Sequence, residues 1–327
     1  MKRLNLILII GSFSSIFTLG PITTTAQVKP YPSHTIQLII PATPGAAIDT
    51  TGRLAADELG KILGTQIITV NKPGASMTLG TDAVVRSKKD GYTLLYANTT
   101  AIVYSRVSSP EIVPYDPVKD LEPLGMHLWV PSVVAVKEDS PWKTFSEFVT
   151  YAKQNPEKIR ISTHSEASID RFNVEICQSL TGAQFSYIPF KGAPEAMTAL
   201  LGGHVEATAT ALSLALPHFS AGKMRILLTS RKYPELPNIP TLTELGYKQE
   251  LNAGWFALYA PAGVPEEVKK ALIPAFQRAV TNPEMKSKIG KMGFIVDYKS
   301  PAELNKIMIE DYEISVAIAI KIGLRKQ

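Results

Sequence analysis

Cysteine is almost absent from this chain: among 327 residues there is only Cys177, so no intrachain disulfide can form. Cys177 lies in the apolar stretch "FNVEICQSL", which favours a buried, inert thiol over a nucleophile. Runs of Lys or Arg are also missing, and the formal net charge of +5 is spread along the chain. A scattered charge of this kind does not indicate a nucleic-acid partner.

Several sequence motifs of enzymes are missing as well. No G-x-G-x-x-G follows the first strand-like run, and no G-x-S-x-G is present for a hydrolase nucleophile. His164 has no second His, Cys or acid at metal-ligand spacing, so we expect neither a metal nor a cofactor. An α/β enzyme acting on a carboxylate remains an alternative, although no catalytic constellation is assembled.

Long apolar runs are confined to the N-terminus. The basic pair Lys2-Arg3 precedes the interrupted apolar stretch Leu4 to Leu19, and Thr24-Thr25-Ala26 offers a small-residue cleavage site. This layout predicts a secretory signal peptide over residues 1–26, because the stretch is short and broken for a membrane anchor, which is the alternative. An exported chain without disulfides suits a bacterial periplasm.

The rest of the chain alternates strand-like runs with helix-like runs, among them helices over Phe145–Gln154 and Ile169–Leu180. Such alternation predicts an α/β fold with two lobes, each a mostly parallel sheet flanked by helices. The strands "LWVPSVVAV" and "ELNAGWFALYA" are expected to cross between the lobes. The expected organisation is lobe 1 over residues 27–131, lobe 2 over residues 132–251, and a return to lobe 1 over residues 252–327.

Four strand-to-helix turns are rich in Gly, Ala, Ser or Thr. They are "PATPGAAIDTTGR" (Pro41–Arg53), "NKPGASMTLG" (Asn71–Gly80), "STHSEASIDR" (Ser162–Arg171) and "PFKGAPEA" (Pro189–Ala196). In open α/β sheets, ligands bind outside the carboxyl ends of the strands, beside helix N-termini. A helix N-terminus carries partial positive charge and backbone N–H groups without an internal partner. Because the surrounding side chains are small, a carboxylate can reach these amides, at roughly 1.5–3 kcal/mol per charge-assisted bond.

The same turns also have a purely structural interpretation. Asp49, Thr78 and Ser168 are residue types that favour the N-cap position, and a helix start would use them whether or not a ligand binds there. Arg53 and Arg171 lie four residues before Asp57 and Glu175, which is the spacing of a solvated i,i+4 ion pair. For Arg53 we expect that ion pair. Arg171 occupies the first turn of a helix that should face the cleft, so both interpretations stay open for it.

Seven motifs follow one another at characteristic spacing. They are "IIPATPGAAIDTTGRLAADEL", "VNKPGASMTLGTDAV", "KKDGYTLLYANT", "YDPVKDLEPLG", "IPFKGAPEAMTALLGGHVE", "ALPHFSAGKMRILLTS" and "GWFALYAPAGVPEEV". They resemble the Bug-type family of periplasmic receptors, the substrate-binding proteins of tripartite tricarboxylate transporters. The resemblance implies a type II-like two-lobed fold that closes on a small organic acid and delivers it, as a monomer, to a membrane permease. The alternative partner is the ectodomain of a sensor kinase, because the binding chemistry would be identical.

The resemblance also implies that backbone amides of the first two turns hold a ligand carboxylate. Carried over to this chain, the first-lobe residues are Thr43, Gly45, Ala46, Ala47, Asp49, Gly74, Ala75, Ser76, Met77 and Thr78. The second lobe would contribute Ser165, Ser168, Gly192, Thr208 and Thr210.

This chain departs from the family pattern at informative positions. Ser76-Met77 replaces a Gly-Gly pair, a change that is tolerated unless a positive φ is required there. Thr210 replaces a common acid, which argues against an ammonium group on the ligand. Arg171 replaces a His and could meet a second carboxylate with its planar guanidinium. We therefore expect a dicarboxylate, aliphatic or aromatic, with one end on the first-lobe amides and the other near Arg171.

Overall fold

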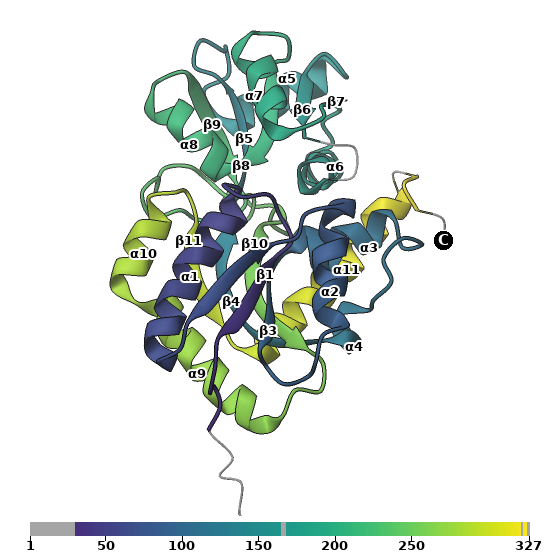
Figure 1. Cartoon of the computed structure of the whole chain (residues 1–327). Coiled ribbons are helices and arrows are strands. Elements are labelled where there is room, and N and C mark those ends of the chain that lie inside the picture. The colour runs from purple at the N-terminus through teal and green to yellow at the C-terminus, as the bar shows by residue number, and fades with distance from the viewer. Residues whose placement is uncertain (1–29, 165–167, 322, 326–327) are drawn as a thin grey trace, which may run out of the picture. The chain divides into compact units, whose positions relative to one another are not determined.

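The computed structural model describes residues 30–164, 168–321 and 323–325, which contain a six-stranded and a five-stranded sheet. Helices flank both sheets (Figure 1). The signal peptide expected over residues 1–26 lies outside the described residues. Among the residues that the structure describes, none of the helices combines the length and the apolar character needed to cross a membrane.

The six-stranded sheet has the strand order β11-β4-β10-β3-β1-β2. Its strands are β1 (Ile36–Ile40), β2 (Ile67–Asn71), β3 (Thr93–Asn98), β4 (Leu121–Val130), β10 (Gly254–Pro261) and β11 (Ile295–Lys299). Strand β1 is parallel to β2 and β3, so these three strands have their carboxyl ends at one edge of the sheet. Strand β10 is antiparallel to β3 and β4, and β11 is antiparallel to β4.

The five-stranded sheet has the strand order β7-β6-β8-β5-β9. Its strands are β5 (Ser132–Lys137), β6 (Arg160–Thr163), β7 (Ser186–Pro189), β8 (Ala207–Ala211) and β9 (Met224–Thr229). Strand β6 is parallel to β7 and β8, and β5 is antiparallel to β8 and β9. Each sheet therefore places its first parallel strand between the two that follow it, and an antiparallel strand beyond them.

The predicted two-lobed α/β fold is confirmed, and both of its sheets are mixed rather than purely parallel. Strands β10 and β5, which enter their sheets from the other lobe, run antiparallel to both of their neighbours, and β11 runs antiparallel to β4. Strand β4 itself runs in the direction of β1 to β3. The first crossing changes sheets at Pro131, between β4 and β5, where a residue without an N–H ends the ladder. The second crossing lies between Thr229 and Gly254. The exact lobe boundaries stay a prediction.

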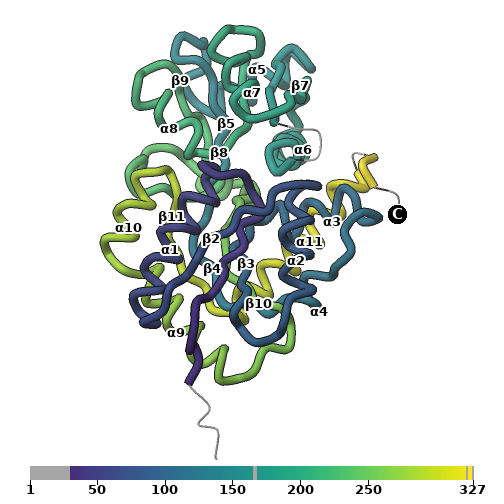
Figure 2. The backbone as a smooth tube through the Cα atoms, in the orientation of Figure 1, coloured from purple at the N-terminus to yellow at the C-terminus, as the bar shows by residue number. Residues whose placement is uncertain are grey.

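The helices beside the six-stranded sheet come from both ends of the chain (purple and yellow in Figure 2). They are α1 (Ala47–Leu63), the 3₁₀ turn η1 (Ala75–Met77), α2 (Thr78–Val85), the π-type turn η2 (Thr100–Tyr104), α3 (Ser105–Ser108), α4 (Pro117–Asp120), α9 (Glu266–Thr281), α10 (Pro283–Gly290) and α11 (Pro301–Lys321).

The helices beside the five-stranded sheet are α5 (Phe145–Gln154), α6 (Ile169–Thr181), α7 (Ala193–Leu201) and α8 (Leu212–Ser220). The predicted helix over Phe145–Gln154 is confirmed, and α6 extends one residue beyond its predicted end. The sequence did not predict α8, which contains Pro217.

The cores lie between the sheets and these helices. Helix α1 has one apolar face, because Ile48, Ala55 and Leu59 are buried against the six-stranded sheet and α9. Full burial of each large apolar side chain contributes roughly 1.5–3 kcal/mol. The Cys177 thiol is buried in the core of the second lobe, and that burial raises its pKa to about 12, as expected for an inert thiol.

Helix α6 belongs to the second lobe but also packs against the first lobe. Its Phe172 belongs to a core cluster built mainly from the six-stranded sheet and stacks on Tyr104 of η2, with ring centroids 5.3 Å apart. Asn173 donates to the carbonyl of Asn252 (3.0 Å) and accepts from its N–H (2.7 Å). The N-terminal end of α6 is thus held against the first lobe and the second crossing.

Candidate ligand-binding site

The first two predicted turns lie side by side at the carboxyl ends of β1 and β2. Ile40 and Asn71 are partners in the ladder, and the N–H of Lys72 donates to the Ile40 carbonyl at 2.9 Å. Gly80 of α2 then approaches the first turn closely: a Cβ there would lie 2.6 Å from the Lys72 carbonyl oxygen and 2.8 Å from Pro41 Cβ. Only a glycine allows this approach, so the sequence itself brings the two turns together.

Asn71 joins the two turns through its side chain. Its Nδ2 donates to the Ala42 carbonyl (2.9 Å) and to Asp49 Oδ1 (2.8 Å), and its Oδ1 accepts from Arg53 Nη2 (2.7 Å). The same Arg53 nitrogen lies 2.9 Å from Asp49 Oδ1. The expected ion pair of Arg53 with Asp57 was therefore wrong. Arg53 turns back towards the strand ends, where the buried carboxylate of Asp49 and the side chain of Asn71 offer better acceptors.

Asp49 holds the first turn from inside α1. The expectation that it is an N-cap was wrong, because the helix begins at Ala47 and Ala46 occupies the N-cap position. Instead, Asp49 Oδ2 accepts the N–H of Gly45 at 2.8 Å. Burial opposes the charge of this carboxylate, but bonds from Arg53, Gly45 and Asn71 outweigh it and lower the pKa of Asp49. One donor of the first turn is thus occupied by the protein's own anion.

The second turn has an unusual backbone. Gly74 has φ 129°, and the following non-glycine residues Ala75, Ser76 and Met77 have φ of 45°, 50° and 74°. Ser76 and Met77, which replace the Gly-Gly pair of the family pattern, therefore do adopt a positive φ, the case in which the replacement is not freely tolerated. A left-handed conformation costs a non-glycine residue roughly 1–2 kcal/mol. The left-handed Met77 is followed by the right-handed Thr78, with φ −64°, and this change of hand turns neighbouring N–H groups to one side, which is the geometry of an anion-binding nest.

Thr78 is the first residue of α2 rather than its N-cap, so that expectation was also wrong. The left-handed Met77 ends the turn and occupies the N-cap position, which moves Thr78 into the helix. Its hydroxyl is buried and has no hydrogen-bond partner within the described part of the chain. The Tyr115 hydroxyl, which lies near Thr81 and Thr78, donates to the Ala101 carbonyl at 2.8 Å instead.

In the second lobe, Ser168 is the N-cap of α6, as predicted, and accepts the N–H of Arg171 at 3.3 Å. The i,i+4 pair of Arg171 with Glu175 is present, but both residues are only 8% exposed, so the pair is buried rather than solvated. The Arg171 guanidinium also stacks over the Tyr187 ring at 3.6 Å. A ligand carboxylate would have to share Arg171 with Glu175.

Thr208 and Thr210 of β8 face the layer of α7 and α8. Their ladder partners on β5, Ala135 and Val133, belong to the core cluster beneath these helices. The Thr208 hydroxyl is engaged inside the lobe, 2.9 Å from Ser162 Oγ. The Thr210 hydroxyl is buried and, among the described residues, has no hydrogen-bond partner.

The helix N-termini at these turns differ in their capping. Within residues 30–164 and 168–321, the N-caps Ala46 of α1, Met77 of α2 and Gly192 of α7 contribute no side-chain cap, whereas Ser168 caps α6. Gly192 is extended, with φ −167°, and a Cβ there would meet only Pro194, at 3.7 Å. The absence of a side chain at Gly192 therefore leaves the backbone N–H groups at the start of α7 accessible.

His164, at the carboxyl end of β6, pairs with the first turn of α6: its Nδ1 lies 2.5 Å from Asp170 Oδ2. Burial acts against the charged imidazole, but Asp170 outweighs it and raises the pKa of His164. Ser165 lies outside the described residues.

Residues that the sequence did not single out join the second turn to α6. The Ser105 hydroxyl donates to the Ser76 carbonyl at 2.8 Å, and the neighbouring Tyr104 stacks on Phe172 of α6. The polar run at the end of β3, Asn98 to Thr100, could have drawn attention to this segment, because it follows a strand just as the four selected turns do.

Two mixed α/β sheets joined by two crossings, with uncapped helix N-termini at the strand ends, define a two-lobed binding protein of the periplasmic type. The chain belongs to the tripartite tricarboxylate transporter receptor family, whose model matches residues 51–324. The resemblance to Bug-type receptors is thereby confirmed.

Individual proteins agree with this assignment. Protein BugT of Bordetella pertussis is 31% identical over 312 residues, which are 91% of this chain and 95% of that protein. The structure of a TctC solute binding protein from Polaromonas has 28% identity and a TM-score of 0.78, covering 89% of this chain and 99% of that one. An R. palustris structure with adipate has a TM-score of 0.76 over 90% of this chain and 98% of that one; its 24% identity shows the fold alone.

Proposed function

We propose that this protein is a periplasmic receptor that captures a small dicarboxylate between its lobes and delivers it to a tripartite transporter permease, without catalysing a reaction. The observation that carries the proposal is the pair of adjoining turns after β1 and β2, where α1 and α2 begin without side-chain caps. Export through cleavage of residues 1–26 belongs to the same proposal.

In this proposal the second turn makes the main contact with one carboxylate. The left-handed residues Ala75 to Met77 supply backbone donors, and the partnerless hydroxyl of Thr78 adds another. Gly74 and the first-turn residues Thr43, Gly45, Ala46 and Ala47 form the wall beside them. Asp49 occupies the Gly45 donor, so the ligand binds to the remaining amides. A carboxylate held by two or three amides still requires the second lobe before binding outweighs the association penalty.

The second lobe would hold the distal end of the ligand. Its candidates are Ser165, Ser168, Arg171, Gly192, Thr208 and Thr210. Arg171 decides the ligand class, because a guanidinium already stacked on Tyr187 and paired with Glu175 offers its remaining donors in a fixed plane. A dicarboxylate such as the adipate found with the R. palustris protein has a second charge to place there.

The experiment begins with a thermal-shift screen of mono-, di- and tricarboxylates, because a ligand that binds only the folded state raises the apparent stability. We expect dicarboxylates to give the largest shifts. Calorimetry with the best acid then compares Thr78→Val with Thr81→Val. Both residues are buried threonines of α2, but the Thr81 hydroxyl already donates to the Met77 carbonyl at 3.0 Å.

The expected result is at least tenfold weaker binding for Thr78→Val and nearly unchanged binding for Thr81→Val. For the distal end, Arg171→Ala should weaken binding, whereas Arg160→Ala, which removes an exposed arginine paired with Glu206, should not. Equal affinity of Arg171→Ala and the wild type would refute the dicarboxylate assignment. If no organic acid shifted the melting temperature, the receptor proposal itself would be lost.

The partner is tested separately, because a sensor would bind the acid in the same way. Acid-dependent capture of the purified permease subunits supports delivery, and capture of a kinase ectodomain supports sensing. Mass spectrometry of the recovered acid tests the absence of a reaction: an altered mass would show an enzyme. Size-exclusion chromatography tests the expected monomer.

A further inference from the structure

A cavity of about 520 Å³ lies away from the predicted ligand site. Trp129 of β4 and Asp297 of β11 form its wall on the six-stranded sheet, at the edge opposite β1 and β2. The other wall is the segment after β9, with Arg231, Lys232 and Glu250. The cavity is therefore lined by both lobes.

Arg231 is held in a fixed orientation in this cavity. Its Cζ lies 3.4 Å from the centroid of the Trp129 ring, and that ring is fixed because Trp129 Nε1 donates to Asp297 Oδ2 at 3.0 Å. A guanidinium that stacks on an aromatic face points its donors outward along the plane of the ring. The Arg231 guanidinium therefore presents its outer N–H groups in a fixed direction.

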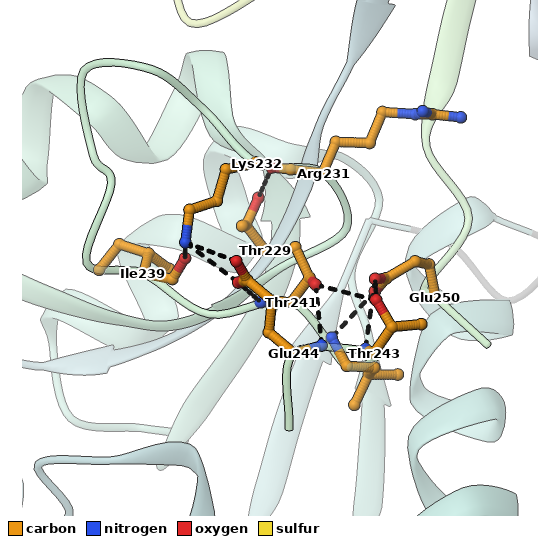
Figure 3. Close-up of polar contacts among 9 residues, drawn as sticks. Thr229, Arg231, Lys232, Ile239, Thr241, Thr243, Glu244 and Glu250 are labelled. Atoms are coloured by element: carbon orange, nitrogen blue, oxygen red, sulfur yellow. Dashed lines mark hydrogen bonds and ion pairs between the residues drawn. The ribbon is translucent and has the colours of Figure 1, made fainter. Parts of the chain in front are cut away.

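The Arg231 guanidinium has no hydrogen-bond acceptor and no ion-pair partner from residues 30–164, 168–321 or 323–325, and its Nε is fully buried. Figure 3 shows its side chain extending away from the neighbouring polar network, with no dashed line from the guanidinium. Burial lowers the pKa of Arg231, although Asp297, Asp311 and Glu250 act in the opposite direction. A cation that is poorly solvated and has no direct partner is unfavourable unless an anion joins it.

The acids of the same segment are already satisfied. Glu250 accepts the N–H groups of Leu242 (2.9 Å) and Thr243 (3.2 Å) as well as the Thr243 hydroxyl. Glu244 pairs with Lys232 at 2.9 Å and accepts the N–H of Thr241 at 3.0 Å. Figure 3 shows these contacts as one connected network. Arg231 thus remains without the direct partner that these three charged neighbours have.

We propose that this cavity binds a small monocarboxylate through the guanidinium of Arg231. The lining carries two cations, Arg231 and Lys232, and three acids, Glu244, Glu250 and Asp297, so the acids outnumber the cations by one. One negative charge can pair with Arg231 in a planar, two-bond contact, whereas a second charge on the same ligand would face Glu250 and Asp297. The site is therefore distinct from the dicarboxylate site and does not depend on it.

The test is an acetate titration of ¹⁵N-labelled protein, followed by NMR of the Arg231 Nε–H signal and of the Trp129 Nε1–H signal, which variants at position 231 keep and which reports their acetate binding. The Arg231 signal should move along a saturable curve with a dissociation constant in the millimolar range. Arg231→Gln should remove this binding, whereas Lys232→Gln, which changes the neighbouring cation already paired with Glu244, should alter the constant less than twofold. Arg231→Lys keeps the charge without the planar fork and should bind acetate at least fivefold more weakly.

Succinate should bind here at least fivefold more weakly than acetate, because its second charge is repelled. Thr78→Val should leave the Arg231 titration unchanged, which separates this site from the proposed transport ligand. A shift that stays linear with acetate, or saturable acetate binding at this site that persists in Arg231→Gln, would overturn the proposal. Succinate binding as tightly as acetate would overturn the monocarboxylate assignment.

Discussion

Ser76 has a backbone conformation that side chains other than glycine rarely adopt, with φ 50° and ψ 43°. Its side chain is exposed, while its carbonyl accepts the Ser105 hydroxyl. The position thus combines backbone strain with almost no side-chain packing. Strain of this kind concentrates at ligand-binding sites, where it positions backbone donors.

Ser76→Gly should stabilise the protein. Glycine adopts the left-handed region freely, so the substitution removes roughly 1–2 kcal/mol of strain and loses part of this gain to the more flexible unfolded chain. We expect the free energy of unfolding in urea to rise by about 0.5–1 kcal/mol. Ser76→Ala, which keeps the strain, is the matched control and should change little. A loss of stability in Ser76→Gly as large as that of Ser76→Val would contradict this account.

The start of α6 is an element whose stability should depend on pH. The buried carboxylate of Asp170 lies 2.5 Å from His164 Nδ1, and this contact raises the pKa of His164 despite the opposing effect of burial. The imidazole side chain is 38% exposed, so solvent screens part of the attraction.

A raised folded-state pKa fixes the sign of the effect. The stabilisation is fully present below the ordinary histidine pKa of about 6.5 and is lost as the pH rises through the higher folded value. The wild type should therefore melt at a higher temperature than His164→Gln. This difference should be largest near pH 5.5 to 6 and should shrink above that range. His204→Gln, which alters an exposed histidine, is the control. A difference that grows with pH would show that the pair does not act in this way.

Elements were the level at which the sequence predicted most. Apolar periodicity located α5, α6 and the parallel strands, because burial of one face depends on spacing alone. The antiparallel direction of β5 and β10 was not predicted, since a crossing strand has the same composition in either direction. The side-chain partners were also missed: Asp49 binds Gly45 and Arg53 because the turn folds back on the helix, a contact that local spacing does not contain.

The donor-rich turns themselves were predictable from their small residues, but not their state in the folded chain. Nothing in the letters "GASM" shows that three successive non-glycine residues take a positive φ, because that depends on how α2 packs through Gly80 against Pro41. Likewise, the engagement of Thr208 by Ser162 follows from strand pairing between β8 and β6.

At the level of the whole molecule, one aromatic stack joins the lobes. Phe172 of α6 is buried against Tyr104 of the first lobe, whereas Phe148 of α5 is buried within the second lobe alone. The two rings are equally inaccessible, so they form a matched pair for separating contact between lobes from stability within a lobe.

Phe172→Ala should increase the radius of gyration of the ligand-free protein in X-ray scattering, because it removes a contact that exists only when the lobes meet. Phe148→Ala should lower the stability of the second lobe by roughly 3–5 kcal/mol while leaving that radius unchanged. Circular dichroism would confirm that both variants are folded at the temperature used. Equal radii for Phe172→Ala and the wild type would show that the stack does not restrain the lobes.

The carboxylate of Asp49 affects how a receptor of this kind releases its ligand. Under the proposed function, Asp49 keeps the Gly45 amide hydrogen-bonded when no ligand is present, so the empty first turn has one unsatisfied donor fewer. The ligand-free state of the proposed receptor would therefore be more stable, and release of the acid correspondingly easier. A lower affinity for the ligand is the consequence of that easier release.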